Sequence, residues 1–325
     1  MEEIIENSTD MEKRTVFMGT PQFAVPVLEA LLHDSYEVIA VYTQPDKLVG
    51  RGRRVSWSPV KSLAMKHEIP VIQPSTFKSA EVAEELASFK PDLIVVAAFG
   101  HILSRELLSS PRFACINVHP SLLPRHRGPS PIASAILSGD ELTGVSIMLM
   151  DSGMDSGPVL TQEKTGIAPA DTTGSLSSKL AELGAKLLLQ TLPVWIKGEI
   201  EPQAQDEAQA TYSKLITGED GEIDWRLPAI GLWRQIRAYN PWPGSYTWFQ
   251  GKRLKIHEAT PLENLPQAKT GEVIALTELP EVVGVGTGNG VLGLCQVQVE
   301  GKREMSVSDF VRGQRNFVGS VLGRS

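Results

Sequence analysis

Residues 92–98 read Asp-Leu-Ile-Val-Val-Ala-Ala, a short and continuous apolar run. A run of this length without polar alternation is typical of a parallel strand that is covered on both faces. A second run, residues 113–118, leads into His119-Pro120, where the proline cannot donate to a β-ladder and ends the strand. Together the two runs predict buried strands of an open α/β sheet.

The N-terminal part of the chain predicts a strand–helix–strand unit. A strand that begins at Thr15 reaches a tight turn at Gly19, and Thr20 is the expected N-cap of a helix over 21–33. A second strand follows at 37–43. The chain has no G-x-G-x-x-G motif, which argues against a dinucleotide site. Further expected helices lie at 60–66, 80–89, 132–137 and 173–197, and further strands at 71–73, 144–150 and 159–165.

The second part of the chain differs in composition. Residues 199–212 are rich in Gln, Asp and Glu and poor in apolar side chains, which is typical of a linker. A helix over 228–238 follows, and then short β-type runs alternate with glycine turns, which predicts a small barrel. The glycine-rich stretch 284–290 matches no phosphate-binding loop and is expected to be a hairpin turn. The predicted organisation is a disordered lead-in at 1–13, an α/β domain at 14–200, a linker at 201–215 and a barrel domain at 216–325.

Composition and charge limit the classes of function. Of 325 residues, 42% are hydrophobic, as in ordinary globular proteins. No apolar stretch approaches the ~18 residues of a membrane span, and the acidic start lacks the features of a signal peptide. Cys115 and Cys295 match no metal-ligand spacing, so we expect reduced cysteines and a cytoplasmic protein. The net charge of −7 means that an RNA partner would need local basic patches.

Two polar side chains stand at the end of the second apolar run. Asn117 and His119 point the same way in a period-2 strand, toward the sheet edge where open α/β folds bind ligands. An amide donates a hydrogen bond without a change of charge, and an imidazole exchanges protons near neutral pH. This pair suits a carbonyl that gains negative charge while it is attacked. A strand-capping histidine with a turn-forming asparagine is the structural alternative.

Longer motifs surround this pair. Residues 117–124 read Asn-Val-His-Pro-Ser-Leu-Leu-Pro, and they are followed by Arg-His-Arg-Gly at 125–128 and Asp-Ser-Gly-Met-Asp-Ser-Gly-Pro at 151–158. Together these motifs resemble the folate-dependent formyltransferase family, and the resemblance extends over nearly the whole chain from Val16. It implies a Rossmann-like formyltransferase domain with a mostly parallel sheet, followed by a small OB-like β-barrel domain that helps to hold tRNA. The implied catalytic residues are Asn117, His119 and Asp155, and the implied folate-lining residues are Ser121, Leu122, Leu123 and Pro124.

The resemblance also implies the substrates. The motifs are most similar to family members that move the formyl group of 10-formyltetrahydrofolate to the α-amine of methionyl initiator tRNA. In those members an insertion like residues 43–54, with Thr-Gln-Pro-Asp and Gly-Arg-Gly, reaches the acceptor stem of the tRNA. Basic side chains suit phosphate, and a solvated surface is the alternative for each of them. The expected tRNA contacts are Arg51, Arg53, Arg54 and Lys61 near this insertion, and Lys252 and Arg253 in the barrel.

The expected mechanism is direct attack of the amine on the formyl carbon. Asn117 and protonated His119 would donate hydrogen bonds to the oxyanion, and Asp155 would keep His119 protonated because a nearby anion raises a histidine pKa. Asp155 could also accept, through water, the proton that the amine loses, and His119 would then protonate the folate nitrogen as it leaves. Asp151 is expected to form a turn through its side chain. No metal is expected. The expected partners are tRNA and folate without a membrane, and the chain is expected to be a monomer.

Other functions remain open at this level. A related enzyme could formylate glycinamide ribonucleotide or an amino sugar, or hydrolyse formyltetrahydrofolate, although the arginine loop and the second domain argue against small substrates. A noncatalytic RNA-binding protein would have no need of Asn117, His119 and Asp155 together. Ser121 could act as a nucleophile beside His119, but no G-x-S-x-G elbow surrounds it.

Overall fold

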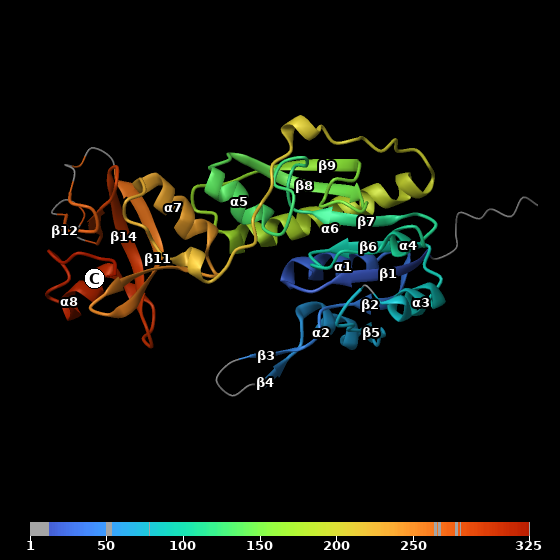
Figure 1. Ribbon diagram of the computed structural model, residues 1–325, viewed down its shortest axis with the longest axis horizontal. Helices are drawn as coiled ribbons and strands as arrows, with labels where there is room; N and C mark the ends of the chain where they lie inside the picture. The colour runs from blue at the N-terminus through green and yellow to red at the C-terminus, as the bar shows by residue number, and fades with distance from the viewer. Residues whose placement is uncertain are drawn as a thin grey trace, which may run out of the picture. The chain divides into compact units, whose positions relative to one another are not determined.

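The computed structural model describes residues 13–49, 54–77, 79–262, 265, 268–276, 279 and 281–324. The chain divides into two compact units (Figure 1). Unit 1 contains residues 1–129, 142–166 and 177–212, and unit 2 contains residues 130–141, 167–176 and 213–325. Each unit is built on a sheet of its own.

In the part of the chain that the structure describes, unit 1 is built on one seven-stranded sheet with the order β5-β2-β1-β6-β7-β8-β9. The first five strands of this order are parallel, and β8 pairs antiparallel with both β7 and β9. The predicted, mostly parallel sheet is thus confirmed. The strands are β1 (Lys13–Gly19), β2 (Tyr36–Tyr42), β5 (Val71–Ile72), β6 (Leu93–Ala97), β7 (Cys115–His119), β8 (Leu142–Leu149) and β9 (Val159–Gly166).

The predicted helix over 21–33 is wrong in its first turn. Gln22–Ala24 form a 3-10 turn, η1, and the α-helix α1 (Val25–Leu32) begins only afterwards. Pro26 explains the difference, because it has no N–H to donate to a carbonyl four residues earlier and therefore occupies the first turn of the α-helix. Unit 1 also contains α2 (Pro59–Lys66), α3 (Ala80–Ser88), α4 (Arg105–Leu108) and most of α6 (Thr173–Ile196), which begins in unit 2.

The two apolar runs became β6 and β7, and every residue of both strands is buried. Cys115 opens β7 as a free thiol, and burial raises its pKa to about 12. Cys295 lies half-buried in β14 (Val291–Val299), where burial raises the pKa of its free thiol to about 11. Both free thiols therefore stay protonated near neutral pH.

Unit 2 contains an antiparallel half-barrel with the order β10-β11-β14-β13-β12, and β15 pairs with β14. The hairpin predicted at 284–290 is confirmed with a shorter turn, because residues 284–286 end β13 and residues 287–290 lead into β14, which pairs antiparallel with β13. Three phenylalanines pack edge to face in the core of this unit: Phe249, Phe310 and Phe317. The remaining elements are β10 (Ser245–Phe249), β11 (Lys252–Leu262), β12 (Val273–Ala275), β13 (Val283–Gly286), β15 (Met305–Ser306), α5 (Pro131–Ser138), α7 (Ala229–Ala238) and α8 (Val307–Gly313).

The described residues contain neither a helix that could cross a membrane nor a cluster that could hold a metal. None of the described helices combines the length and the apolar character that a bilayer crossing requires. Within the same residues, no three His, Cys, Asp or Glu side chains come together in a way that could hold a metal ion.

Candidate active site

β7 carries two polar side chains to the carboxyl end of the parallel strands. Only 8% of Asn117 and 4% of His119 is exposed. On one side β7 pairs in parallel with β6, and on the other it pairs antiparallel with β8, which places Ser146 opposite His119. Because β7 is paired on both edges, the backbone that carries both groups is fixed by the sheet.

The loop between β8 and β9 supplies a third polar group. Asp151 accepts hydrogen bonds from the Gly153 N–H (2.9 Å) and the Ser156 hydroxyl (3.0 Å), which confirms the turn predicted for it. Asp155 has a positive φ of 51°, which Asp tolerates better than most residues. Gly157 allows this loop to approach β8, because a Cβ there would overlap a backbone carbonyl at the end of that strand.

Asp155 joins Asn117 and His119 in one polar cluster. Asn117 Nδ2 donates to Asp155 Oδ1 at 3.5 Å, and His119 Nδ1 lies 3.6 Å from Asp155 Oδ2. The same Oδ2 accepts a 2.7 Å hydrogen bond from the Gly128 N–H. The structure therefore brings together the three residues for which the sequence predicted a catalytic role, and it adds a backbone donor that the sequence did not reveal.

The environment of His119 sets its protonation. Nε2 lies 3.2 Å from the carbonyl oxygen of His126, and because a carbonyl only accepts, Nε2 carries a hydrogen. Burial lowers the pKa of His119 from its ordinary value of 6.5, and the Asp155 carboxylate opposes this shift without reversing it. This direction favours the neutral ring in the free protein, whereas from the sequence Asp155 was expected to keep the imidazole protonated. Neutral His119 presents Nδ1 as an acceptor on the side of Asp155.

The expected folate-lining segment is held from the neighbouring strand. The Ser146 hydroxyl on β8 donates to the Ser121 carbonyl at 2.6 Å and accepts from the Leu123 N–H at 3.1 Å. The Ser121 side chain is fully buried and donates to a backbone carbonyl within the turn, which leaves no accessible nucleophile there. Leu123 is also buried, so Leu122 and Pro124 are the partly exposed side chains of the four.

The polar stretch that the sequence predicted as a linker contacts this site. We call residues 203–212 the strap. Gln205 Nε2 donates to the carbonyl oxygens of Asp155 (2.8 Å) and Gly157 (2.7 Å). Gln203 forms a β-bridge with Val159, at the start of β9. The strap therefore supports the backbone of the loop from which the Asp155 carboxylate extends.

Arg127 ties the strap to the loop that follows β7. Its side chain is 1% exposed, and the guanidinium donates to Gln205 Oε1 (3.0 Å), to both carboxylate oxygens of Glu207 (3.0 and 2.7 Å) and to the Tyr212 hydroxyl (3.1 Å). Its backbone N–H donates to the Thr211 carbonyl at 2.9 Å. These bonds, led by those to Glu207, raise the pKa of Arg127. One buried guanidinium thus links the strap to the segment that leads into Gly128.

Arg127, Gln205 and Glu207 were missed by reasoning from the sequence. A signal was present, because Gln203, Gln205 and Glu207 alternate at the period of an extended chain. Polar composition alone does not separate a solvated linker from a polar segment with partners. The partners are also far apart along the chain, since Arg127 and Glu207 are 80 residues from each other.

The predicted tRNA-binding insertion contains a hairpin. Its strands are β3 (Lys47–Val49) and β4 (Arg54–Ser56), which pair antiparallel and project from unit 1 (Figure 1). Arg54 opens β4. Arg51 and Arg53 lie outside the described residues.

Lys61, on α2, has a structural partner. Its ammonium donates to Asp46 at 2.6 Å and to Gln73 at 2.8 Å, and the side chain is only 14% exposed. The ammonium also lies 5.2 Å from the centre of the Trp57 ring. In this structure Lys61 therefore connects Asp46, near the start of the insertion, with Trp57, just after its end, and its charge is already paired.

Lys252 and Arg253 are both exposed but lie on opposite faces of β11, because successive strand residues alternate. The Arg253 guanidinium lies 4.5 Å from the Tyr246 ring centre and 5.4 Å from that of Trp248. The two expected tRNA contacts of unit 2 are thus available to solvent, in two different environments.

Comparison with known proteins gives the family. Residues 13–192 match the formyl transferase family, and residues 215–315 match the formyl transferase C-terminal domain. This chain belongs to the formyl transferase family. The formyl transferase is 46% identical over 315 residues to a methionyl-tRNA formyltransferase of Roseiflexus sp. strain RS-1, which covers 96% of each chain. The resemblance seen in the motifs is confirmed, and the chain is an enzyme of the formyltransferase class.

Solved structures share the fold of this formyl transferase. An N-formyltransferase from Helicobacter canadensis in complex with folinic acid and dTDP-3-aminofucose matches with a TM-score of 0.64 and 18% identity, over 88% of this chain and 100% of that one. HypX from Aquifex aeolicus in complex with tetrahydrofolic acid matches with a TM-score of 0.60 and 19% identity, over 94% of this chain and 48% of that one. The formyl transferase thus spans about half the length of HypX.

Proposed function

We propose that this formyltransferase moves the formyl group of 10-formyltetrahydrofolate to the α-amine of methionyl initiator tRNA, and so supplies formylmethionyl-tRNA for translation initiation. The observation that carries the proposal is the cluster of Asn117, His119 and Asp155 at the end of β7. It occurs in a chain that matches methionyl-tRNA formyltransferases over almost its whole length.

Asn117 is the proposed donor to the oxyanion. When the amine attacks the formyl carbon, negative charge develops on the formyl oxygen. Asn117 Nδ2 has two hydrogens, and the bond to Asp155 uses one of them, which leaves the other for this oxygen. Because Asn117 is buried and sits on a paired strand, its dipole is oriented in advance. One such donor is typically worth about 2.7–4 kcal/mol of transition-state stabilisation.

His119 is the proposed acceptor of the proton that the amine loses. The new carbon–nitrogen bond leaves a surplus proton on the amine, and a neutral imidazole of lowered pKa takes it at Nδ1. Asp155 then stabilises the imidazolium, since a nearby anion favours the charged form. The imidazolium returns the proton to N10 of the folate as the bond from N10 to the formyl carbon breaks. The enzyme therefore ends in its starting protonation state.

The strap is the proposed positioning element for this chemistry. Gln205 holds the backbone of Asp155, and Arg127 holds Gln205 and the chain that leads into Gly128. Geometry of this kind matters, because displacement of a catalytic group by about 1 Å can cost ~100-fold in rate.

We place the folate beside residues 121–124 and the tRNA on the basic residues. Leu122 and Pro124 offer partly exposed apolar surface to the pterin. The β3–β4 hairpin, with Arg51, Arg53 and Arg54, is the proposed contact to the acceptor end, and Lys252 and Arg253 are the proposed contacts in unit 2. We further propose that the protein acts in the cytoplasm, because charged tRNA and reduced folate are found there. We also propose that it is a monomer. Transfer to a small amine and hydrolysis of the folate are not favoured, since the matched full-length relatives are methionyl-tRNA formyltransferases.

The test is formyl transfer from 10-formyltetrahydrofolate to charged initiator tRNA, with charged elongator methionine tRNA as the comparison. We expect transfer to the initiator alone. Equal transfer to both tRNAs would contradict the initiator assignment, and folate turnover without a tRNA product would favour hydrolysis.

A further inference from the structure

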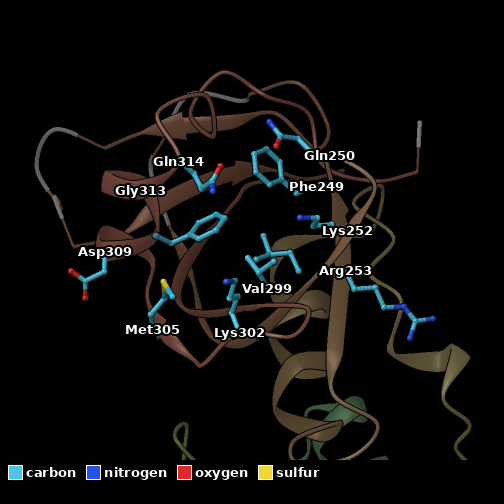
Figure 2. A pocket seen from close by; sticks show the side chains of 12 residues that line it. Phe249, Gln250, Lys252, Arg253, Val299, Lys302, Met305, Asp309, Gly313 and Gln314 are labelled. Atoms are coloured by element: carbon cyan, nitrogen blue, oxygen red, sulfur yellow. The ribbon is translucent and has the colours of Figure 1, made fainter.

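Unit 2 contains a hollow between the β10–β11 turn, the end of β14 and α8 (Figure 2). Its volume is about 290 Å³. This is close to the lower end of the ~300–1,000 Å³ typical of ligand sites, so the space suits one ring system rather than a helix or a long acyl chain. We call it the unit 2 hollow.

The floor of the hollow is apolar and rigid. It is formed by Phe249, Leu254, Val299, Met305 and Phe310. The two phenylalanines are buried and pack edge to face with each other, with ring centres 6.1 Å apart. Met305 and Val299 are only partly buried, so they present methyl groups to the open space. A flat, largely apolar ligand fits such a floor.

Two lysines stand at the rim. Lys252 follows a turn in which Gln250 and Gly251 both have positive φ (50° and 73°), the geometry of a tight hairpin that fixes the start of β11. Lys302 is fixed by its N–H, which donates to the Val299 carbonyl at 2.9 Å. Both lysines are exposed, and among the described residues neither forms an ion pair. The rim therefore offers two ammonium groups to an anion.

The other charged residues of the lining do not face the space. Arg253 points away from the hollow in Figure 2, and its guanidinium lies over Tyr246. Asp309 also points outward in Figure 2, forms a 2.9 Å ion pair with Arg312 and accepts a hydrogen bond from Ser306 at the start of α8. No free carboxylate of the described lining thus opposes an anion at the lysines.

We propose that the unit 2 hollow binds one unpaired nucleotide of the RNA substrate, with the base on the apolar floor and a phosphate between Lys252 and Lys302. A base supplies a flat apolar body with polar edges, for which the Gln250 and Gln314 amides of the lining are suitable partners. The phosphate supplies the anion that the unpaired ammonium groups favour. The identity of the macromolecule rests on the proposed tRNA function, whereas the nucleotide chemistry of the hollow rests on its own residues.

The experiment uses the full chain labelled with 13C at the methionine ε-methyl groups, in which Met305 reports on the hollow. The Met305 signal is assigned with Met305→Leu. Adenosine 5′-monophosphate should shift this signal saturably with a Kd of ~1 mM, as expected for a single nucleotide. Ribose 5-phosphate, which lacks the base, should bind at least about tenfold more weakly if stacking on the floor contributes.

A matched pair of variants tests whether Lys302 binds the nucleotide as part of the hollow or acts only through its positive charge. Lys302 lines the hollow, and its neighbour Arg303 is exposed but does not line it. Lys302→Ala should weaken binding of adenosine monophosphate about fivefold, and Arg303→Ala should leave it unchanged. Equal losses in both variants, equal binding of ribose 5-phosphate, or no saturable shift at ~20 mM nucleotide would overturn the proposal. Displacement of the nucleotide by dodecanoate at lower concentration would instead identify an acyl site and overturn it as well.

The same variants test whether the hollow contacts the tRNA substrate. Lys302→Ala should raise the KM for charged initiator tRNA about fivefold without a change in kcat, and Arg303→Ala should change neither. If the chain formylates tRNA but adenosine monophosphate does not bind, the hollow proposal fails and the function stands. If adenosine monophosphate binds but no tRNA is formylated, the proposed function fails and the nucleotide site stands.

Discussion

Arg127 and Lys252 use positive charge in opposite ways. Arg127 is 1% exposed, and its guanidinium is bound by Gln205, Glu207 and Tyr212. Lys252 is exposed at the rim of the unit 2 hollow, where no described carboxylate pairs with it. A paired, buried charge fixes the geometry of its surroundings, whereas an unpaired, exposed charge is left for a ligand.

The same contrast extends to the regions around these residues. Near β7 the polar groups are buried and bind one another, so a substitution there should change the fold or the chemical step. At the unit 2 hollow the charges are solvated, so a substitution should change affinity and salt dependence instead. Substitutions in the two regions should therefore have effects that can be told apart by kcat on one side and by KM on the other.

The largest expected effect is that of His119→Ala. Loss of the proton acceptor should lower kcat by ~10²–10⁴-fold, while the KM for tRNA changes less than twofold. Steady-state formylation assays measure both constants. His33→Ala is the control, because His33 is an exposed histidine of the same unit and its loss should leave the rate unchanged. A normal kcat in His119→Ala would remove this residue from the mechanism.

Arg127→Ala should destabilise the protein. The variant loses a guanidinium with four side-chain hydrogen bonds and leaves a cavity. Because its partner Glu207 is 69% exposed, we expect a loss of about 2–3 kcal/mol in the free energy of unfolding, below that of a fully buried pair. Lys252→Ala should stay within ~0.5 kcal/mol. Equal urea midpoints for the two variants would contradict the comparison.

Substitutions of Gln205 test whether the strap positions the loop that carries Asp155. Gln205→Ala removes the two donor bonds to the loop of Asp155 and should lower kcat about tenfold with an unchanged KM. Gln205→Glu keeps an acceptor for Arg127 but loses both donors, so it should lower kcat as well. Gln209→Ala is the matched control, because Gln209 is an exposed glutamine of the strap whose side chain donates to the nearby Asp206. If Gln205→Glu restored the full rate, the donor bonds would have no role.

The smallest expected effect is on the pH dependence of kcat/KM. Burial lowers the pKa of His119 below 6.5, and the rate needs the neutral ring as well as the neutral methionyl amine, so kcat/KM should show an acid limb of His119 at that lowered pKa, below the limb of the amine itself. Asp155→Asn removes an anion that raises this pKa, so the acid limb should move to still lower pH while the rate falls. Lys252→Ala should leave the position of the limb unchanged. An acid limb that moved upward in Asp155→Asn would contradict the assignment to His119.

The features that could be predicted from the sequence are those that depend on residues close together in the chain. The continuous apolar runs became β6 and β7, and the strand end at Pro120 placed Asn117 and His119 at the sheet edge. The Asp155 role came from a motif, and the structure brings that carboxylate to within 3.6 Å of His119. Glycine spacing was enough to predict the β13–β14 turn.

What the sequence did not predict depends on contacts between distant segments. The strap has the composition of a linker, and only the fold shows that Gln205 meets Arg127 across 78 residues. From the sequence, Lys61 was expected to contact phosphate, whereas in the structure its ammonium is paired with Asp46. The protonation of His119 depends on burial, which outweighs Asp155 and which no motif reports.

The most direct test of this account is the single-turnover rate of formyl transfer at saturating charged initiator tRNA, measured for the parent protein, Asn117→Ala and Lys252→Ala. Asn117→Ala should slow the step by ~10²–10³-fold, because it removes the donor to the oxyanion. Lys252→Ala should reach the parent rate once the tRNA is saturating. A parent-like rate in Asn117→Ala, or a slow step in Lys252→Ala that more tRNA does not restore, would contradict the separation of chemistry from RNA binding.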